Sequence, residues 1–294
     1  DHRYSSAVER SFGRAAGQRC AFGVRVFGLI LQQTWLSPCD RDEFPRRMAK
    51  KGGPRLNSMV AIFSAFWFYA SMTAIGVALS PWAVSSSAAA LAAGRALDRC
   101  LRFGMRWMLG VRVEVRGLEH RPDGGALVAA KHLSTYDSVA PFSLLPRPIF
   151  VLKRELLSLP VFGFYAKRLG VPIDRSAGGA ALRTMLKGAK AAIADGRQFV
   201  VFVEGTRKPV DSAPDYKTGI ALLYGQLRQP CYILALNTGI VWPHNSWARR
   251  KGKILFEFLP PIPPGLPTED FMAELQTRLE AASDRLIAEG RGAQ

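Results

Sequence analysis

The sequence feature that most constrains the fold is a long uncharged stretch in the first third of the chain. No Asp, Glu, Lys or Arg occurs from Asn57 to Gly94, and the first part, MVAIFSAFWFYASMTAIGVALSPWAV, is almost wholly apolar. The segment from Met59 to Leu79 reaches the roughly 20 residues that a membrane-spanning helix needs, and Pro81 is expected to end or kink it. A buried core helix is the alternative, but it would normally be shorter and would show a polar face. The stretch therefore predicts insertion into a membrane.

Basic residues flank this stretch on both sides, so the positive-inside rule selects no orientation. A re-entrant or surface-lying helical pair satisfies both flanks, with SSSAAALAAGRALDRCLRFGMRWML as its second, amphipathic helix. Residues 56–108 are accordingly predicted to form a membrane-associated helical segment with both ends on the cytoplasmic side. The flanking residues are Arg46, Arg47, Lys50, Lys51 and Arg55 before it, and Arg95, Arg99, Arg102 and Arg106 after it.

Residues 1–55 are Arg-rich and only weakly periodic, which predicts a basic, poorly ordered extension. Met48 and Met59 both suit a start of translation, and no small-residue cleavage site follows the apolar part, AFGVRVFGLIL, as a signal peptide would require. The four cysteines stand far apart, without a CxxC pair or zinc-ligand spacing. We interpret them as reduced thiols facing the cytoplasm.

The chain is strongly basic, with a formal net charge of +17 and a pI near 10.3. Such a charge calls for an anionic partner, which nucleic acid, anionic lipid headgroups and phosphorylated small molecules all provide. Charge alone does not choose among them. The 48% hydrophobic composition of the 294 residues excludes disorder as the default and is enough to bury a substantial core.

From about residue 109 to 294, short β-branched runs alternate with helical patterns, which predicts an α/β sheet covered on both faces. LPPIPPGLP is expected to be a rigid, extended linker into a final amphipathic helix at about 268–288. The predicted strands are VRVEVRG, GALVAAK, RPIFVLK, QFVVFVEG, CYILALN and GKILFEFL, and the other predicted helices cover about 138–145, 156–169, 179–194 and 218–227.

Three polar clusters follow apolar strands, where open α/β sheets place their ligand sites. The first, KHLSTYD, offers His132 and Asp137. A neutral imidazole can take a proton from a hydroxyl, and a carboxylate on its other nitrogen fixes the tautomer. A plain helix cap at Asp137 explains the same pattern equally well.

The other two clusters suit an anion. In GVPIDRS, Arg175 can present its planar guanidinium to a phosphate, although a surface ion pair with Asp174 is the simpler explanation for that motif alone. In VFVEGTRK, Gly205 allows a sharp turn that gathers donors around one point, and Glu204 can orient the arginine or bind a substrate hydroxyl. The alternative is a strand-to-loop turn with solvated charges. The gathered donors are Thr206, Arg207 and Lys208.

Taken together, the clusters resemble the four-block signature of the glycerolipid acyltransferase family. KHLSTYD matches its H-x-x-x-x-D block, GVPIDR and FVEGTR are similar to the second and third, and YILALNTG is similar to the fourth. The resemblance runs from about Arg112 to Ile262, and it is strongest to the bacterial members that acylate 1-acylglycerol 3-phosphate. Three residues depart from the usual pattern: Val203 for proline, Lys131 for asparagine and Lys208 for serine.

The resemblance implies a mixed, largely parallel sheet flanked by helices, and a role for each matching residue. His132, oriented by Asp137, would deprotonate the sn-2 hydroxyl of lysophosphatidic acid, which then attacks an acyl thioester to give phosphatidic acid. Arg175, Arg207, Thr206 and Lys208, with Glu204 and Gly205, would form the substrate-phosphate site. The resemblance implies acyl carrier protein or coenzyme A as the thioester carrier, with no metal or other cofactor, at the cytoplasmic side of a bacterial inner membrane. Replacing His132 by Ala or Asp137 by Asn is expected to abolish transfer and to leave the fold intact.

Three alternatives stay open at this point. Glycerol 3-phosphate or a lyso-aminolipid is another acceptor for the same chemistry. A membrane-anchored nucleic-acid-binding protein fits the net charge, but we find no recognition motif for it. A hydrolase using Ser134 as nucleophile lacks a G-x-S-x-G elbow.

Overall fold

The computed structural model describes residues 55–159, 161–244 and 249–292, and most of the predicted amino-terminal extension (1–55) lies outside them. Residues 54–294 form one compact unit. In chain order, its helices are α3 (Arg55–Ala83), α4 (Ser87–Leu109), α5 (Pro141–Leu144), α6 (Phe162–Leu169), α7 (Gly179–Ala194), α8 (Gly219–Leu227) and α9 (Thr268–Gly292). Its strands are β1 (Arg112–Arg116), β2 (Ala126–Ala130), β3 (Pro148–Lys153), β4 (Gly170–Ile173), β5 (Gln198–Phe202), β6 (Cys231–Leu236) and β7 (Lys253–Ile262).

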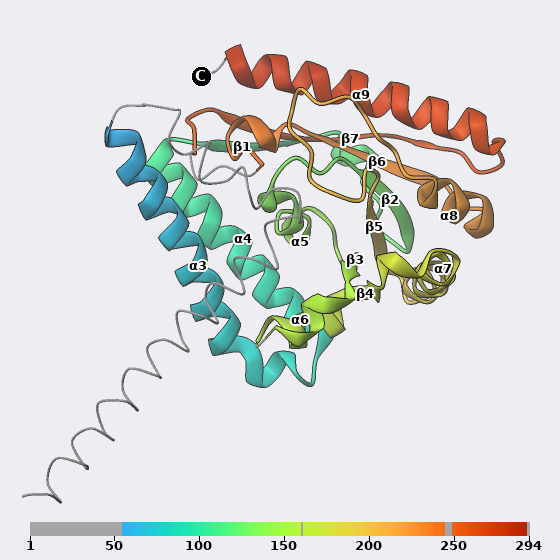
Figure 1. The fold of residues 1–294 in the computed structure, drawn as a ribbon, viewed down its shortest axis with the longest axis horizontal. Helices are drawn as coiled ribbons and strands as arrows, with labels where there is room; N and C mark the ends of the chain where they lie inside the picture. Colours follow the sequence, from blue (N-terminus) through green and yellow to red (C-terminus); the bar gives the residue numbers. More distant parts are fainter. Residues whose placement is uncertain (1–54, 160, 245–248, 293–294) are drawn as a thin grey trace, which may run out of the picture. The chain divides into compact units, whose positions relative to one another are not determined.

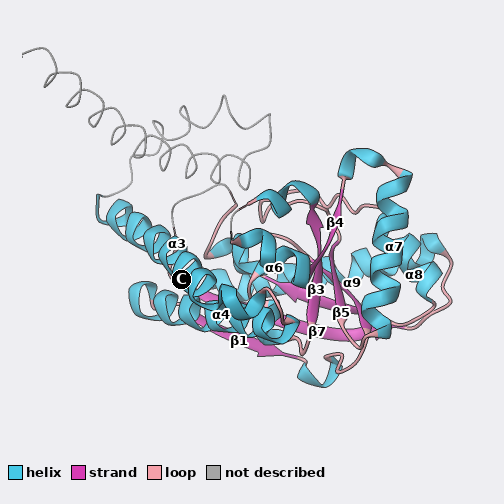
Figure 2. Ribbon diagram, turned by 90° about the horizontal axis from the view of Figure 1, so that it is seen from below, coloured by secondary structure: helices cyan, strands magenta, loops and turns pink. Residues whose placement is uncertain are grey.

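The uncharged stretch forms α3, which packs along α4 at one end of the unit (Figures 1 and 2). Within α3, Ile62–Ala83 has the length and apolar composition needed to cross a membrane, and 22% of that window is buried by the protein. The helix ends at Ala83, two residues after Pro81. Ser86 then caps α4 by accepting from the N–H of Ala89, and Gly110 ends α4 in the left-handed region.

The seven strands lie in the order β1-β7-β6-β2-β5-β3-β4, and every neighbouring pair is parallel except β6 and β7. The expected mixed, largely parallel sheet flanked by helices is thus confirmed. Buried side chains of α7, α8 and α9 cover one face of the central strands. At the other face, Tyr136 packs between Trp242 and Phe256.

Three sequence expectations differ from the structure. The helix expected at 156–169 is divided into a 3-10 turn (Arg154–Ser158) and α6, because a residue that precedes a proline such as Pro160 disfavours helical geometry. The helix expected at 138–145 is only the short α5. LPPIPPGLP is not wholly a linker, since β7 continues to Ile262. Pro260 and Pro261 of β7 lie where the register between β6 and β7 shifts. A proline there does not have to donate an N–H to the neighbouring strand.

Candidate active site

Strands β2, β5 and β6 bring the predicted polar clusters together. These strands are parallel neighbours, and Ala130 at the end of β2 is level with Phe202 of β5 and Leu234 of β6. The residues that follow these three strands therefore lie together at the carboxyl ends of the central strands. They include His132, Glu204 and Thr238.

The ring of His132 stacks on Phe202, the last residue of β5, at a centroid distance of 4.0 Å and an interplanar angle of 11°. Its Nδ1 lies 3.2 Å from Oδ2 of Asp137. With Asp137 ionised, Nδ1 carries the proton and Nε2 keeps its lone pair. Burial lowers the pKa of His132 below its usual value of 6.5, and Arg207 and Arg175 lower it further, against the opposing effect of Asp137. The ring is therefore a neutral base at neutral pH.

Asp137 is fully buried and holds more than the imidazole. Oδ2 also accepts hydrogen bonds of 2.7 Å from the backbone N–H groups of Leu133 and Ser134. Oδ1 accepts one of 2.5 Å from the hydroxyl of Thr238. Ser134 and Asp137 form a capping box around the 3-10 turn Thr135–Ser138. The helix-cap explanation of KHLSTYD therefore holds as a capping box, and the same carboxylate also contacts His132. The catalytic role of the pair stays a prediction.

Helix α4 supports the same loop from outside. Tyr136 donates a 2.7 Å hydrogen bond to Asp98, whose other oxygen pairs with Arg102 at 2.7 Å. Asp98 and Tyr136 are both completely buried. A buried, ion-paired carboxylate thus fixes the loop to the helix that packs on α3.

The segment after β5 brings a cation to the loop. Arg207 donates a 2.8 Å hydrogen bond to the hydroxyl of Thr135. Burial lowers its pKa, and the charge of Asp137 opposes that effect. Gly205 has a φ of 66°, which other residues rarely adopt, and its N–H closes the turn onto Phe202. That N–H is therefore already used within the fold.

The remaining predicted residues lie around this point in different environments. Arg175 is exposed but still acts electrostatically on His132. It makes no ion pair with Asp174, whose carboxylate instead accepts from the N–H and hydroxyl of Ser176. The ion-pair explanation of Arg175 is therefore wrong. Thr206 is exposed, and Lys208 pairs loosely with Asp215 at 3.4 Å.

Glu204 is 1% exposed, and neither carboxylate oxygen has a hydrogen bond of normal geometry. Burial raises its pKa, against the opposing charge of Lys131. The Lys131 ammonium is itself paired with Glu280 of α9 at 2.6 Å, and Tyr216 donates to the same carboxylate at 2.7 Å. The lysine that departs from the family pattern thus ties the end of β2 to the last helix.

Sequence reasoning missed several contributors. Thr238, which binds Asp137, lies in the quoted YILALNTG motif. Its position just after a predicted strand could have indicated that it belongs to the site. Tyr69 of α3 lies within electrostatic range of both Arg207 and Arg249. Nothing in the sequence indicated this, because Tyr69 lies in the uncharged stretch that was interpreted only as membrane-inserting. The Arg249 guanidinium stacks 3.9 Å over the buried ring of Trp242.

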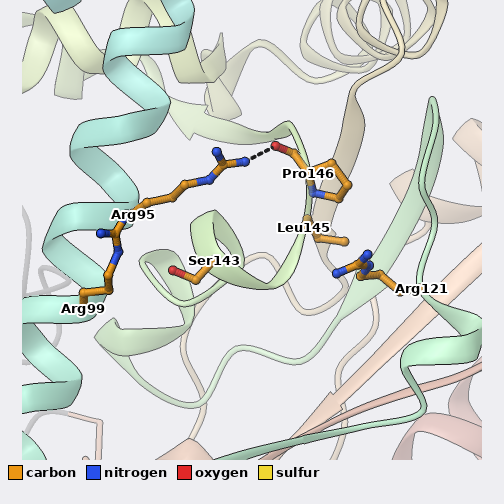
Figure 3. A pocket seen from close by; sticks show the side chains of 6 residues that line it. All are labelled: Arg95, Arg99, Arg121, Ser143, Leu145 and Pro146. Carbon is orange, nitrogen blue, oxygen red and sulfur yellow. Dashed lines mark hydrogen bonds between the residues drawn. The ribbon is translucent and has the colours of Figure 1, made fainter.

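A basic pocket lies at the opposite ends of the strands, near the starts of β2 and β3 (Figure 3). It encloses about 410 Å³ and includes Arg95, Arg99 and Arg121. Arg95 donates to the carbonyls of Phe142 and Pro146, so it fixes α4 to the segment that follows the loop of residues 131–137. In the described part of the chain, no three His, Cys, Asp or Glu side chains gather as a metal site requires. The expectation of a metal-free, cofactor-free reaction stays a prediction.

Fold and site together define a class: an α/β enzyme in which a partly buried histidine contacts a buried aspartate beside an arginine suited to anions. Residues 112–239 match the sequence profile of the family described as Acyltransferase. The 1-acyl-sn-glycerol-3-phosphate acyltransferase of Pseudomonas aeruginosa is 33% identical over 185 residues, which are 63% of this chain and 72% of that protein. The alpha form of the human enzyme of that name is 30% identical over 180 residues, covering 60% and 64% of the two chains.

A solved structure agrees with the fold. The crystal structure of the 1-acyl-sn-glycerophosphate acyltransferase from Thermotoga maritima superposes with a TM-score of 0.64 at 20% identity, over 78% of this chain and 97% of that one. The chain belongs to the glycerolipid acyltransferase family, in which the 1-acyl-sn-glycerol-3-phosphate acyltransferases are its relatives.

Proposed function

We propose that this enzyme transfers a fatty acyl group from an acyl thioester to the sn-2 hydroxyl of lysophosphatidic acid and so makes phosphatidic acid. The observation that carries the proposal is the His132–Asp137 pair, with Arg207 hydrogen-bonded to Thr135 of the same loop. A proton acceptor and a phosphate-binding cation thereby stand side by side. The names of the relatives support the same acceptor.

The reaction balances with these groups. Nε2 of His132 takes the proton of the acceptor hydroxyl as the oxygen attacks the thioester carbonyl. The tetrahedral intermediate expels the thiolate, which takes the proton back from the imidazolium. An ester and a free thiol result. Arg207, with Arg175, Thr206, Lys208, Glu204 and Gly205 around it, holds the phosphate so that the hydroxyl faces His132.

We assign α3 and α4 to the membrane. Large apolar side chains on both helices are exposed, including Phe66 at 66% and Trp107 at 75%. Because Tyr69 of α3 lies near Arg207, a lipid held by α3 has its headgroup beside the catalytic loop. This arrangement supports association with a membrane. Attachment to a bacterial inner membrane, with the site on its cytoplasmic side, is a further part of the proposal.

The test is an assay of the purified full-length chain with lysophosphatidic acid and both acyl-carrier-protein and coenzyme A thioesters. Phosphatidic acid should form, and its formation should be lost in His132→Ala. A panel containing glycerol 3-phosphate and lyso-aminolipids with the same labelled donor tests the acceptor. Preferential acylation of one of these would replace lysophosphatidic acid, and salt-dependent DNA binding without acyl transfer would favour the nucleic-acid alternative. Trapping of an acyl-enzyme on Ser134 would favour hydrolysis.

A further inference from the structure

The outer face of α7 carries a row of positive charge. Arg183, Lys187 and Lys190 are all exposed, and their spacing of four and three residues places them on one face of the helix. The opposite face, with Met185 and Ala189, is buried against the sheet. The row therefore points directly away from the core.

Helix stability does not account for this row. Like charges four residues apart, as at Arg183 and Lys187, repel each other. α7 contains no Asp or Glu. None of the three cations makes an ion pair or side-chain hydrogen bond with another described residue. Since nothing in the described fold neutralises it, this charge is available to a partner.

An exposed arginine close to the candidate active site precedes the row in the chain. Arg175 is exposed and lies just before α7 in the chain. Its charge lowers the pKa of His132, so its guanidinium is within electrostatic range of the imidazole. In chain order, exposed cations thus follow one another from Arg175, within electrostatic range of His132, to the α7 row.

This surface is separate from the apolar helices. In both views α7 lies at the far end of the unit from α3 and α4 (Figures 1 and 2). α7 exposes no large apolar side chain, whereas such side chains are exposed along α3 and α4. An interfacial helix needs an apolar face to enter the bilayer. The α7 row therefore fits a soluble anionic partner better than a membrane surface.

We propose that the α7 row is the docking surface for a small acidic protein that carries the acyl group as a thioester, so that acyl carrier protein is the donor. The inference rests on the proposed function. Carboxylates on such a carrier can pair with Arg183, Lys187 and Lys190, whereas coenzyme A has no protein surface to offer them. Both donors carry a phosphate on the pantetheine arm, so that phosphate does not distinguish them.

The experiment replaces two of these charges in the full-length chain, as Lys187→Glu/Lys190→Glu. Steady-state kinetics are measured with the same acyl chain on acyl carrier protein and on coenzyme A. With the protein carrier, kcat/KM should fall at least tenfold, mainly through KM, and with coenzyme A it should stay within twofold. Added salt should reduce the wild-type rate more with the protein carrier than with coenzyme A.

Two control variants isolate the surface. Lys187→Arg/Lys190→Arg keeps the charge and should retain use of both donors. Arg112→Glu/Lys251→Glu makes the same change in net charge at exposed positions near β1, the opposite edge of the sheet from β4. It should alter neither donor preference nor carrier affinity.

Other results would overturn the inference. An equal loss with both donors would place the α7 row in the general catalytic machinery. Weaker binding of the double variant to vesicles containing anionic phospholipid would make the row a membrane contact. Absence of wild-type transfer from the protein carrier, with transfer from coenzyme A intact, would refute docking and leave the proposed function standing.

If neither donor is used, the proposed function fails, and direct binding still decides the docking surface. Fluorescence anisotropy of labelled acyl carrier protein should show at least tenfold weaker binding to Lys187→Glu/Lys190→Glu than to wild type. Equal affinity would refute the assignment.

Discussion

Replacing Asp137 by Asn should destabilise the protein as well as inactivate it. The carboxylate accepts two backbone N–H bonds of 2.7 Å, a hydroxyl bond of 2.5 Å from Thr238 and the contact with His132. An asparagine that keeps its carbonyl toward the backbone N–H groups places its amide toward Thr238, whose hydroxyl can rotate to accept. The acceptor for the two N–H groups survives without its charge, and the acceptor for Thr238 becomes a donor.

The size of the effect follows from that loss of charge. A hydrogen bond to a charged group contributes about 1.5–3 kcal/mol, against about 0.5–1.5 kcal/mol for a neutral one. Losing roughly 1 kcal/mol at each of the two N–H bonds, and somewhat less at Thr238, gives an expected destabilisation of about 2–3 kcal/mol. His132→Ala leaves Asp137 with all three of these partners and removes mainly the stack on Phe202. It should therefore cost less stability while abolishing transfer.

Thermal and denaturant unfolding of both variants, beside acyl-transfer assays, tests this reasoning. Asp123→Asn at an exposed position is the control and should leave the unfolding transition where it is. A stability of Asp137→Asn within about 0.5 kcal/mol of wild type would show that the carboxylate does not hold the loop. That outcome would restore the expectation from sequence that the fold tolerates this substitution.

Three further predictions concern the surrounding residues. Arg207→Gln should raise KM for the phosphorylated acceptor, and an unchanged KM removes Arg207 from the phosphate site. Because Arg207 lowers the pKa of His132, the substitution should also move the acid limb of the kcat/KM profile to higher pH, from a wild-type position below pH 6.5. Tyr136→Phe leaves a buried oxygen of Asp98 without its donor and should lower the free energy of unfolding by about 1–3 kcal/mol; no change on denaturant titration would contradict this. Glu204→Gln should weaken acceptor binding. It should also raise the free energy of unfolding at neutral pH, because the raised pKa of Glu204 makes its ionised form costly in the folded state. This gain should vanish as the pH falls below about 4.5, where wild-type Glu204 is protonated, and a gain that persists there would refute a charge effect.

The sequence predicted the parts of this molecule whose pattern is local. The uncharged stretch became α3, and five apolar runs became β1, β2, β3, β5 and β6 close to their expected limits. The site residues were found because each follows a strand and belongs to a quoted motif. Parallel pairing of β2 with β5 and β6 then brought three of these motifs together at the carboxyl ends of the strands.

Long-range contacts were not predictable from such patterns. Asp98 lies in an amphipathic helix, where an aspartate at this spacing from Arg102 suggests only an i, i+4 pair. Nothing local indicates that it also binds Tyr136. The same holds for Lys131 and Glu280, which meet only because the sheet brings α9 back over β2. β7 was cut short because its two prolines suggested a linker.

The pairing of β1 with β7 has a consequence for synthesis. β1 ends at Arg116, and its only neighbour among the described strands, β7, begins at Lys253, so 137 further residues (253 − 116) must be translated before the two can pair. At bacterial and eukaryotic rates of about 5–20 residues per second, the wait is about 7–27 s. During that time α3 and α4 have already left the ribosome with their apolar faces uncovered, so a lipid surface or a chaperone can take them up before the sheet closes.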